Sequence, residues 1–343
     1  MNRRDFIGGL GSAGCLASLA LGAKGALSST GLIKPPRLSP GDTIGLVNPA
    51  TAAFETMPID ILTESLEALG LRVVKGESYF DRRGYFAGTD EDRAGDINRF
   101  FADTSVKALL ARGGWGASRV LPLLDYELIR NNPKVVLGYS DVTALLLAIH
   151  AKTGLVTFHA PYPPTQKFSA DYLRRTVFDA EAVRMENPKE VDDDETVQTE
   201  DRIQVLTPGT ARGRIFGGNL TVLTTIVGSD YLPDWRGAIL FLEDVDEAVY
   251  RIDRMLNQLK LAGVLEQIRG FVFGRCTDCP PGGGYGSLTL EDVLDDYIKP
   301  LGIPAWRGTM IGHIDRQFTV PLGVEVEIDA GAGVIQMLEP GVA

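Results

Sequence analysis

The stretch that decides the fold is Lys134-Val-Val-Leu-Gly-Tyr-Ser140-Asp-Val-Thr-Ala-Leu-Leu-Leu-Ala-Ile-His150. Its first apolar run, residues 135–138, is typical of a short buried strand, and the apolar residues from Val142 onwards recur at helical spacing. Ser140 therefore stands in the turn between a strand and a helix. In a nucleophile elbow such a turn exposes the serine hydroxyl, and the helix start offers free N–H groups to a developing oxyanion. The stretch predicts a serine hydrolase.

A second interpretation of the same residues is purely structural. A Ser-Asp pair before an apolar helix is also an ordinary N-cap. The pattern Gly138-Tyr-Ser140-Asp-Val lacks the second glycine of G-x-S-x-G, so the α/β-hydrolase form of the elbow is not matched. Capping and nucleophilic catalysis both stay open on these residues alone.

Strand-like and helix-like runs alternate before this turn. We expect strands at 43–47, 72–74 and 106–111 and helices at 58–69, 90–101 and 125–131. This rhythm predicts a parallel sheet flanked by helices, with ligand-binding loops at the carboxyl ends of the strands. Ser140 lies at such an end, and so does the loop Arg112-Gly113-Gly114-Trp115-Gly116.

The second half of the chain has a different character. Prolines at 161, 163 and 164 and the acidic cluster 192–195 indicate a linker and crossing. Beyond it, extended runs are expected at 209–216, 238–242, 270–273, 324–328 and 333–338, with one helix at 247–262. The predicted fold is therefore α/β, with an export signal at 1–30, an N-terminal α/β domain at 38–165, a linker at 166–205 and a β-rich C-terminal domain at 206–343.

Composition restricts the partners of the protein. A length of 343 residues with 44% hydrophobic residues suffices for packed cores, and the net charge is −11. Nucleic acids and anionic membrane surfaces are bound through basic patches, so this acidity argues against both. We expect a small-molecule or peptide ligand.

The N-terminus predicts export. Arg3-Arg4-Asp5-Phe6 precedes an uncharged run to Ala23, as in a twin-arginine signal that would carry the folded protein to the periplasm. A spare basic start is the plain alternative. Ser12-Ala-Gly-Cys15 weakly resembles a lipidation site, so membrane contact is expected only through the signal or this cysteine. Cys276-Thr-Asp-Cys279 is too little for a zinc site and leaves a local disulfide or two free thiols.

A nucleophilic serine needs a base and a group that orients the base. Of the three histidines, His150 lies too far along its helix and is expected at the helix end or exposed. His159 follows an extended run and competes with His313, which stands in a glycine-flanked turn. Glu243 emerges from a buried strand and could orient the base. Alternatively, Glu243, Asp244 and Asp246 open the following helix, where acidic residues favour the helix dipole.

Six motifs follow one another along the chain: Gly41-Asp-Thr-Ile-Gly-Leu-Val-Asn-Pro-Ala50, Arg112-Gly-Gly-Trp-Gly116, Gly138-Tyr-Ser140-Asp141, Gly217-Gly-Asn-Leu220, Leu242-Glu243-Asp244 and Gly312-His313. With them the chain resembles the LD-carboxypeptidase family of serine peptidases, which includes murein tetrapeptide carboxypeptidases and microcin-immunity peptidases. The resemblance implies Ser140 as nucleophile, His313 as base and Glu243 as its orienter. It also implies an oxyanion hole from Asp141 and Gly113-Gly114, with Trp115 beside the substrate, in a site between the two domains.

The resemblance implies removal of a terminal D-alanine from a murein tetrapeptide, with no metal and no cofactor. A peptidyl-nucleotide antibiotic is the alternative substrate. In the immunity peptidases, the segment after the position of Pro161 supplies an aromatic platform for a nucleotide. That segment contains no tryptophan here, since the three tryptophans are Trp115, Trp235 and Trp306. A non-catalytic muropeptide-binding protein is the third possibility. The sequence allows a homodimer and does not decide the oligomeric state.

Overall fold

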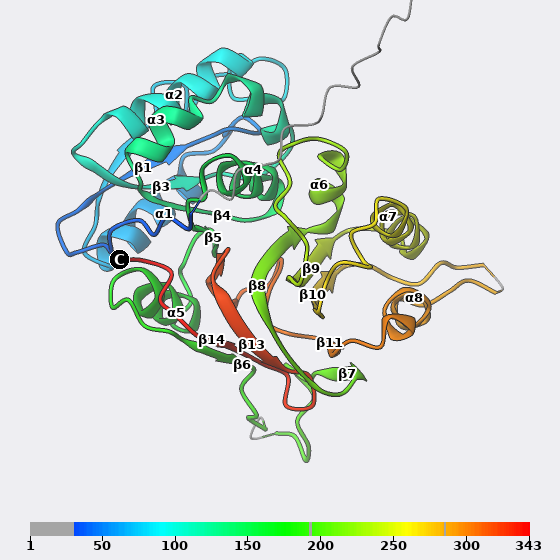
Figure 1. Cartoon of the computed structure of the whole chain (residues 1–343). Coiled ribbons are helices and arrows are strands. Elements are labelled where there is room, and N and C mark those ends of the chain that lie inside the picture. Colours follow the sequence, from blue (N-terminus) through cyan, green and yellow to red (C-terminus); the bar gives the residue numbers. More distant parts are fainter. Residues whose placement is uncertain (1–30, 192–193, 285) are drawn as a thin grey trace, which may run out of the picture. The chain divides into compact units, whose positions relative to one another are not determined.

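The computed structural model describes residues 31–191, 194–284 and 286–343 (Figure 1). The predicted export signal, with Arg3, Arg4 and Cys15, lies outside these residues. Residues 31–343 form one compact unit that contains two sheets. No helix in the described part of the chain is both long and apolar enough to cross a membrane.

The first sheet has the strand order β12-β5-β4-β3-β1-β2. All neighbours are parallel except β12, which pairs antiparallel with β5. The carboxyl ends of the parallel strands therefore meet at one edge. The strands are β1 (Thr43–Val47), β2 (Arg72–Lys75), β3 (Val106–Ala111), β4 (Val135–Gly138), β5 (Thr157–His159) and β12 (Val320–Leu322).

Four α-helices accompany this sheet, and local sequence explains where they begin. The helix α2 starts at a capping box formed by Thr89 and Asp92. The helix α4 is buried over almost its whole length because it packs between the two sheets, which explains its apolar run. The helices are α1 (Met57–Ala68), α2 (Asp90–Ala102), α3 (Tyr126–Asn131) and α4 (Thr143–Thr153), with 3-10 turns at Ala117–Leu123 and Ser140–Val142.

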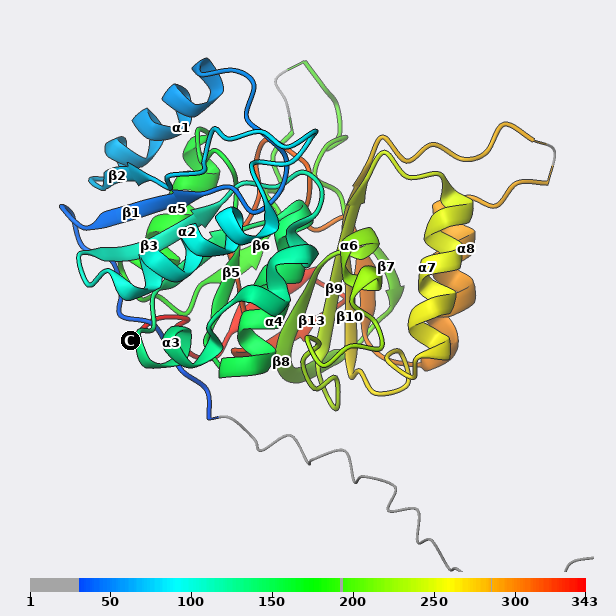
Figure 2. The ribbon, with the colours of Figure 1, turned by 90° about the horizontal axis from the view of Figure 1, so that it is seen from above.

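The second sheet has the order β6-β14-β13-β8-β9-β10-β11-β7, in which β8 to β11 are parallel and the outer strands antiparallel. Figure 2 shows the helices α7 and α8 side by side next to this sheet. The elements are β6 (Arg184–Glu186), β7 (Gln204–Thr207), β8 (Thr210–Asn219), α6 (Leu220–Thr225), β9 (Ile239–Val245), α7 (Val249–Leu261), β10 (Gly270–Thr277), α8 (Leu290–Tyr297), a 3-10 turn (Lys299–Leu301), β11 (Ala305–Arg307), β13 (Glu325–Asp329) and β14 (Val334–Met337).

The predicted α/β class is confirmed, with a largely parallel N-terminal sheet and a β-rich C-terminal half. Two details differ from the sequence expectation. The segment expected as a linker, 166–205, contains α5 (Lys167–Val177), β6 and the start of β7. The strand β12 comes from the C-terminal half and yet joins the first sheet. The domain boundaries stay a prediction.

A close approach of α4 to β8 brings the two sheets together near Ser140. The backbone of Gly218 has φ +140, and a Cβ there would lie 2.6 Å from Cγ2 of Thr143. The hydroxyl of Thr143 accepts a hydrogen bond from the backbone N–H of Asn219 at 3.0 Å. Only glycine fits this position, so the motif Gly217-Gly-Asn-Leu220 is needed for packing.

Candidate active site

Ser140 occupies the strained turn that an elbow requires. Its φ is +61, in the left-handed region that costs a residue with a Cβ about 1–2 kcal/mol. The turn is tight, since a Cβ on Gly138 would lie 2.6 Å from Cγ1 of Val142. The capping interpretation is wrong, because α4 begins only at Thr143 and no side-chain cap is made by Ser140. Its hydroxyl is free to face another element.

That element is the loop that carries His313. The Nε2 atom of His313 lies 2.9 Å from Oγ of Ser140, and its Nδ1 lies 2.7 Å from Oε2 of Glu243. A carboxylate accepts hydrogen bonds only, so Nδ1 carries the proton and Nε2 is left to accept from the serine hydroxyl. The three side chains form one continuous chain of hydrogen bonds.

The backbone around His313 allows its imidazole to come within hydrogen-bonding distance of Glu243. Gly312 has φ +131, and a Cβ there would lie 3.1 Å from Cβ of Glu243 and 3.2 Å from its Oε2. The hydroxyl of Thr277 donates to the carbonyl of His313 at 2.9 Å and holds the loop from the other side. Glu243 is fully buried at the end of β9. The glycine therefore allows the buried carboxylate to reach the imidazole.

Asp244, the next residue on β9, has a different role. Its Oδ2 accepts from the backbone N–H and the hydroxyl of Thr221, both at 2.9 Å, and its Oδ1 from the amide of Asn219 at 3.0 Å. Burial raises the pKa of Asp244 to about 6. Asp244 thus anchors the start of α6. The expectation that Glu243, Asp244 and Asp246 open α7 is wrong, because the first turn of α7 contains no acidic residue.

The other two histidines are not placed to act on Ser140. His159 is fully buried against Tyr139 and Phe241, with no hydrogen bond to either ring nitrogen from the described residues. Burial lowers the pKa of His159 to about 4, so it is neutral at neutral pH. His150 lies at the end of α4, as expected, but is buried rather than exposed, and its Nδ1 contacts the carbonyl of Leu155 at 3.0 Å.

The loop after β3, residues 113–116, is called the glycine loop and lies against the serine. A Cβ on Gly113 would be 3.2 Å from Cβ of Ser140 and 3.7 Å from its Oγ. Within the described residues, no hydrogen bond uses the backbone N–H groups of Gly113, Gly114 or Asp141. They are available to an oxyanion. The indole of Trp115 beside them is 70% exposed, so it is open to a ligand.

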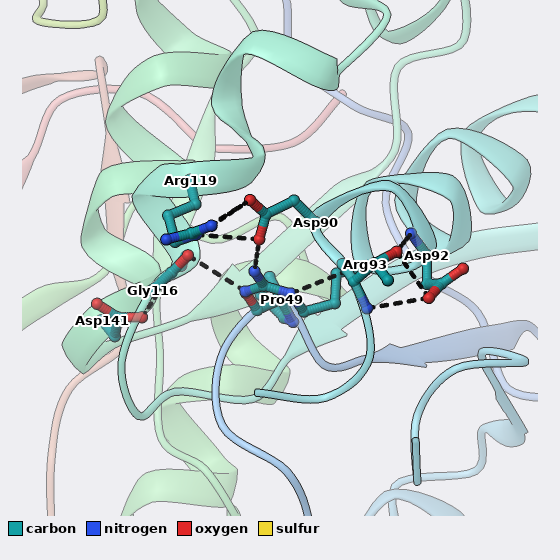
Figure 3. Close-up of polar contacts among 9 residues, drawn as sticks. Pro49, Asp90, Asp92, Arg93, Gly116, Arg119 and Asp141 are labelled. Carbon is teal, nitrogen blue, oxygen red and sulfur yellow. Dashed lines mark hydrogen bonds and ion pairs between the residues drawn. The ribbon is translucent and has the colours of Figure 1, made fainter. Parts of the chain in front are cut away.

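Arg93 on α2 contacts the end of this loop at Gly116 (Figure 3). Its guanidinium is buried, pairs with Asp90, and donates to the carbonyl of Pro49 and, at 3.2 Å, to that of Gly116. Asp90 also accepts hydrogen bonds from Arg119, from Nη2 at 2.8 Å and from Nε at 3.0 Å. Sequence reasoning missed Arg93, because nothing along α2 distinguishes it from the exposed charges around it.

Asp141 ties the elbow to the same loop. Its Oδ2 accepts the backbone N–H of Ala117 at 2.7 Å, directly after Gly116. Burial raises the pKa of Asp141 to about 6, although this hydrogen bond and the charge of Arg93 act in the opposite direction. The hydrogen bond from Ala117 to Asp141 and the buried cation of Arg93 therefore fix the position of the elbow relative to the glycine loop.

Cys276, near the end of β10, forms a disulfide with Cys279 in the turn that follows the strand. This resolves the alternative left open by the sequence. The enclosed Thr277 is the residue that holds the carbonyl of His313.

The arrangement is suited to acyl transfer. A serine next to an imidazole that a buried carboxylate orients has an available base, and free N–H groups beside it can stabilise an oxyanion. The structure brings together Ser140, His313 and Glu243, and it places Gly113 against the serine.

Comparisons with known proteins identify the family of the chain. The LD-carboxypeptidase N-terminal domain matches residues 44–160, and the C-terminal domain of the same family matches residues 212–328. The chain is 40% identical to the probable murein peptide carboxypeptidase of Bacillus subtilis (strain 168), over 90% of this chain and 95% of that protein. It is 30% identical to the microcin C7 self-immunity protein MccF of Escherichia coli, over 85% of this chain and 92% of that protein.

Solved structures have the same fold. MccF in complex with aspartyl sulfamoyl adenosine superposes with a TM-score of 0.80 at 28% identity, over 91% of this chain and 100% of that one. The muramoyltetrapeptide carboxypeptidase from Oxalobacter formigenes gives a TM-score of 0.72 at 26% identity, over 86% and 97%. On both family domains and on these relatives, the chain belongs to the LD-carboxypeptidase family.

Proposed function

We propose that the protein is a serine carboxypeptidase that removes the terminal D-alanine from murein tetrapeptides. The observation that carries this proposal is the chain of hydrogen bonds Ser140–His313–Glu243. The substrate class is supported by the murein peptide carboxypeptidase relative at 40% identity.

In the proposed mechanism, Oγ of Ser140 attacks the carbonyl of the diamino acid that precedes D-alanine. His313 takes the hydroxyl proton at Nε2 and returns it to the leaving amine, while Glu243 stabilises the imidazolium. The N–H groups of Asp141 and the Gly113-Gly114 turn would stabilise the oxyanion. Water, activated by His313, then releases the tripeptide from the acyl-enzyme.

The test is direct. The purified protein is incubated with murein tetrapeptide, and the products are analysed by mass spectrometry, with Ser140→Ala as the control. We expect tripeptide and free D-alanine from the wild type only. Absence of both products with folded wild-type protein would refute the proposal.

A peptidyl-nucleotide substrate is the second candidate, since MccF is 30% identical and its solved structures superpose at a TM-score of 0.80. The aromatic platform expected after Pro161 is not supplied by a tryptophan. Trp306 is fully buried and Trp235 is 5% exposed, so neither can stack on a base, and the exposed Trp115 belongs to the glycine loop before Pro161. A non-catalytic muropeptide-binding protein is the third candidate, and it would not react with a fluorophosphonate.

We also propose that the protein acts in the periplasm, on the basis of Arg3-Arg4 and the uncharged run after them. Fusion of the first ~40 residues, a length that covers such a signal, to a reporter tests this. We expect export, and a block when both arginines become lysine. Retention of the unaltered fusion in the cytoplasm contradicts it.

A further inference from the structure

Arg112 is a half-buried cation that has no carboxylate partner among the described residues. It is the last residue before the glycine loop, at the carboxyl end of β3. Its Nη1 donates to the carbonyl of Thr51 at 2.6 Å and also lies 3.2 Å from the hydroxyl of Thr51 and 3.4 Å from the carbonyl of Ala52. Across the described residues, no acceptor meets its Nε or Nη2, and no ion pair includes it.

Other arginines near the site are paired. Arg93 and Arg119 share Asp90, and Arg275 and Arg316 share Asp201. A charge that is partly removed from water is costly unless an opposite charge or full hydrogen bonding compensates it. Arg112 therefore has donors and charge left for a ligand.

The surroundings of Arg112 are neutral and polar. The hydroxyls of Tyr79 and Tyr162 lie 2.7 Å apart, and Arg112 is close enough to lower the pKa of both against the larger effect of burial. When one hydroxyl donates to the other, one O–H remains to donate elsewhere. One positive charge and one spare hydroxyl are suited to an anion.

Arg112 is also at the right distance from the nucleophile. A Cβ on its neighbour Gly113 would lie 3.7 Å from Oγ of Ser140. Because consecutive Cα atoms are about 3.8 Å apart, the backbone of Arg112 lies within roughly 9 Å of that oxygen. In a peptide cut before its last residue, the terminal carboxylate is three bonds, under about 4 Å, from the attacked carbonyl carbon. An arginine side chain can span the difference.

We propose that Arg112 binds the terminal carboxylate of the substrate and thereby makes the enzyme a carboxypeptidase. This rests on the proposed function. The free Nε and Nη2 donors match the two oxygens of a carboxylate, as in bidentate arginine pairs. A C-terminal amide offers one acceptor and no charge at this position. Arg112 is thus a residue that determines specificity for the chain end.

The experiment compares a murein tetrapeptide with its C-terminal amide, and wild type with Arg112→Gln and Arg112→Lys. We expect wild type to favour the acid in kcat/KM by about 10- to 100-fold, the range of charge-assisted hydrogen bonds. Arg112→Gln should bring that ratio close to one, and Arg112→Lys should retain part of it. Labelling of Ser140 by a fluorophosphonate, which has no carboxylate, should stay unchanged.

Arg119→Gln is the matched control, because it removes an arginine behind the same loop and should leave the acid-to-amide ratio unchanged. A ratio in Arg112→Gln equal to that of wild type overturns the role of Arg112 and leaves the proposed function intact. A loss of labelling in Arg112→Gln equal to its loss of turnover also overturns that role, since it marks a structural defect. Lack of turnover of both peptides by folded wild type overturns the proposed function and this inference together.

Discussion

The two sheet edges that meet at the site hold their residues by different means. At the end of β4, the backbone places Ser140, through a positive φ and the close contact of Gly138 with Val142. Near the end of β9, side chains contribute as well as the backbone of Gly312, since Glu243 holds His313 through a hydrogen bond of 2.7 Å. Conservative substitutions of the β9 carboxylates should therefore change either catalysis or stability while the protein still folds. At Ser140 on the β4 side, a residue that accepts a positive φ should raise stability but should not restore catalysis.

The largest effect is expected for Ser140. Ser140→Ala should lower kcat/KM for the tetrapeptide by about 10⁴ to 10⁶, because it removes the proposed nucleophile. Ser140→Gly should be equally inactive but more stable by about 1 kcal/mol, since glycine accepts a φ of +61 without strain. Turnover assays and chemical denaturation measure the two effects. Activity in either variant removes Ser140 as the nucleophile.

His313→Ala should be about as inactive as Ser140→Ala, because the two residues act as a unit. The matched control is His159→Phe, which keeps a buried aromatic ring and removes two ring nitrogens that have no hydrogen bond within the described residues. It should keep kcat within about tenfold of wild type, since His159 does not contact the serine. An active His313→Ala beside an inactive His159→Phe would show that His159 is the base.

The adjacent carboxylates of β9 offer a sharper contrast. Glu243→Gln should lower kcat by roughly 10² to 10⁴ with little loss of stability, since the base survives without its orienter. Asp244→Asn should do the reverse, because Asp244 anchors Thr221 and Asn219 and does not touch His313. Kinetics and thermal unfolding of both variants test this. Equal kinetic losses would mean that the two carboxylates are not divided in this way.

Asp244 also predicts a pH dependence of stability. Its pKa is raised to about 6 in the folded protein, so folding favours the protonated form. This group therefore lowers the free energy of unfolding as the pH rises from about 4 through 6. Asp244→Asn should lack this contribution. Denaturation curves of both proteins across that range measure the difference, and parallel curves would contradict it.

A moderate effect on turnover is expected for Arg93, which acts only through the glycine loop. Arg93→Lys keeps the charge but cannot reach Asp90, Pro49 and Gly116 together, so the loop loses part of its support. We expect kcat to fall by about 10- to 100-fold with KM nearly unchanged, as for a weakened oxyanion hole. A rise in KM alone would assign Arg93 to substrate binding instead.

The same difference between the two edges explains what the sequence could predict. The strand, the turn and the glycines around Ser140 are local, so their pattern indicated the elbow and the parallel sheet. His313 and Glu243 are 70 residues apart and meet through tertiary structure, so residue patterns left His159 as a competitor and only the family resemblance decided between them. The roles of Arg93 and Arg112 could not be predicted from the sequence, because they depend on tertiary contacts. Asp90 lies beside Arg93, whereas no carboxylate among the described residues pairs with Arg112.

The central claim is that His313, held by Glu243, activates Ser140. Fluorophosphonate labelling followed by peptide mass spectrometry tests it most directly, because the probe reports nucleophilicity without requiring the right substrate. We predict one adduct, on the peptide that contains Ser140, present in wild type and in His159→Phe and absent from His313→Ala. An adduct on another residue, or undiminished labelling of Ser140 in His313→Ala, would contradict the claim.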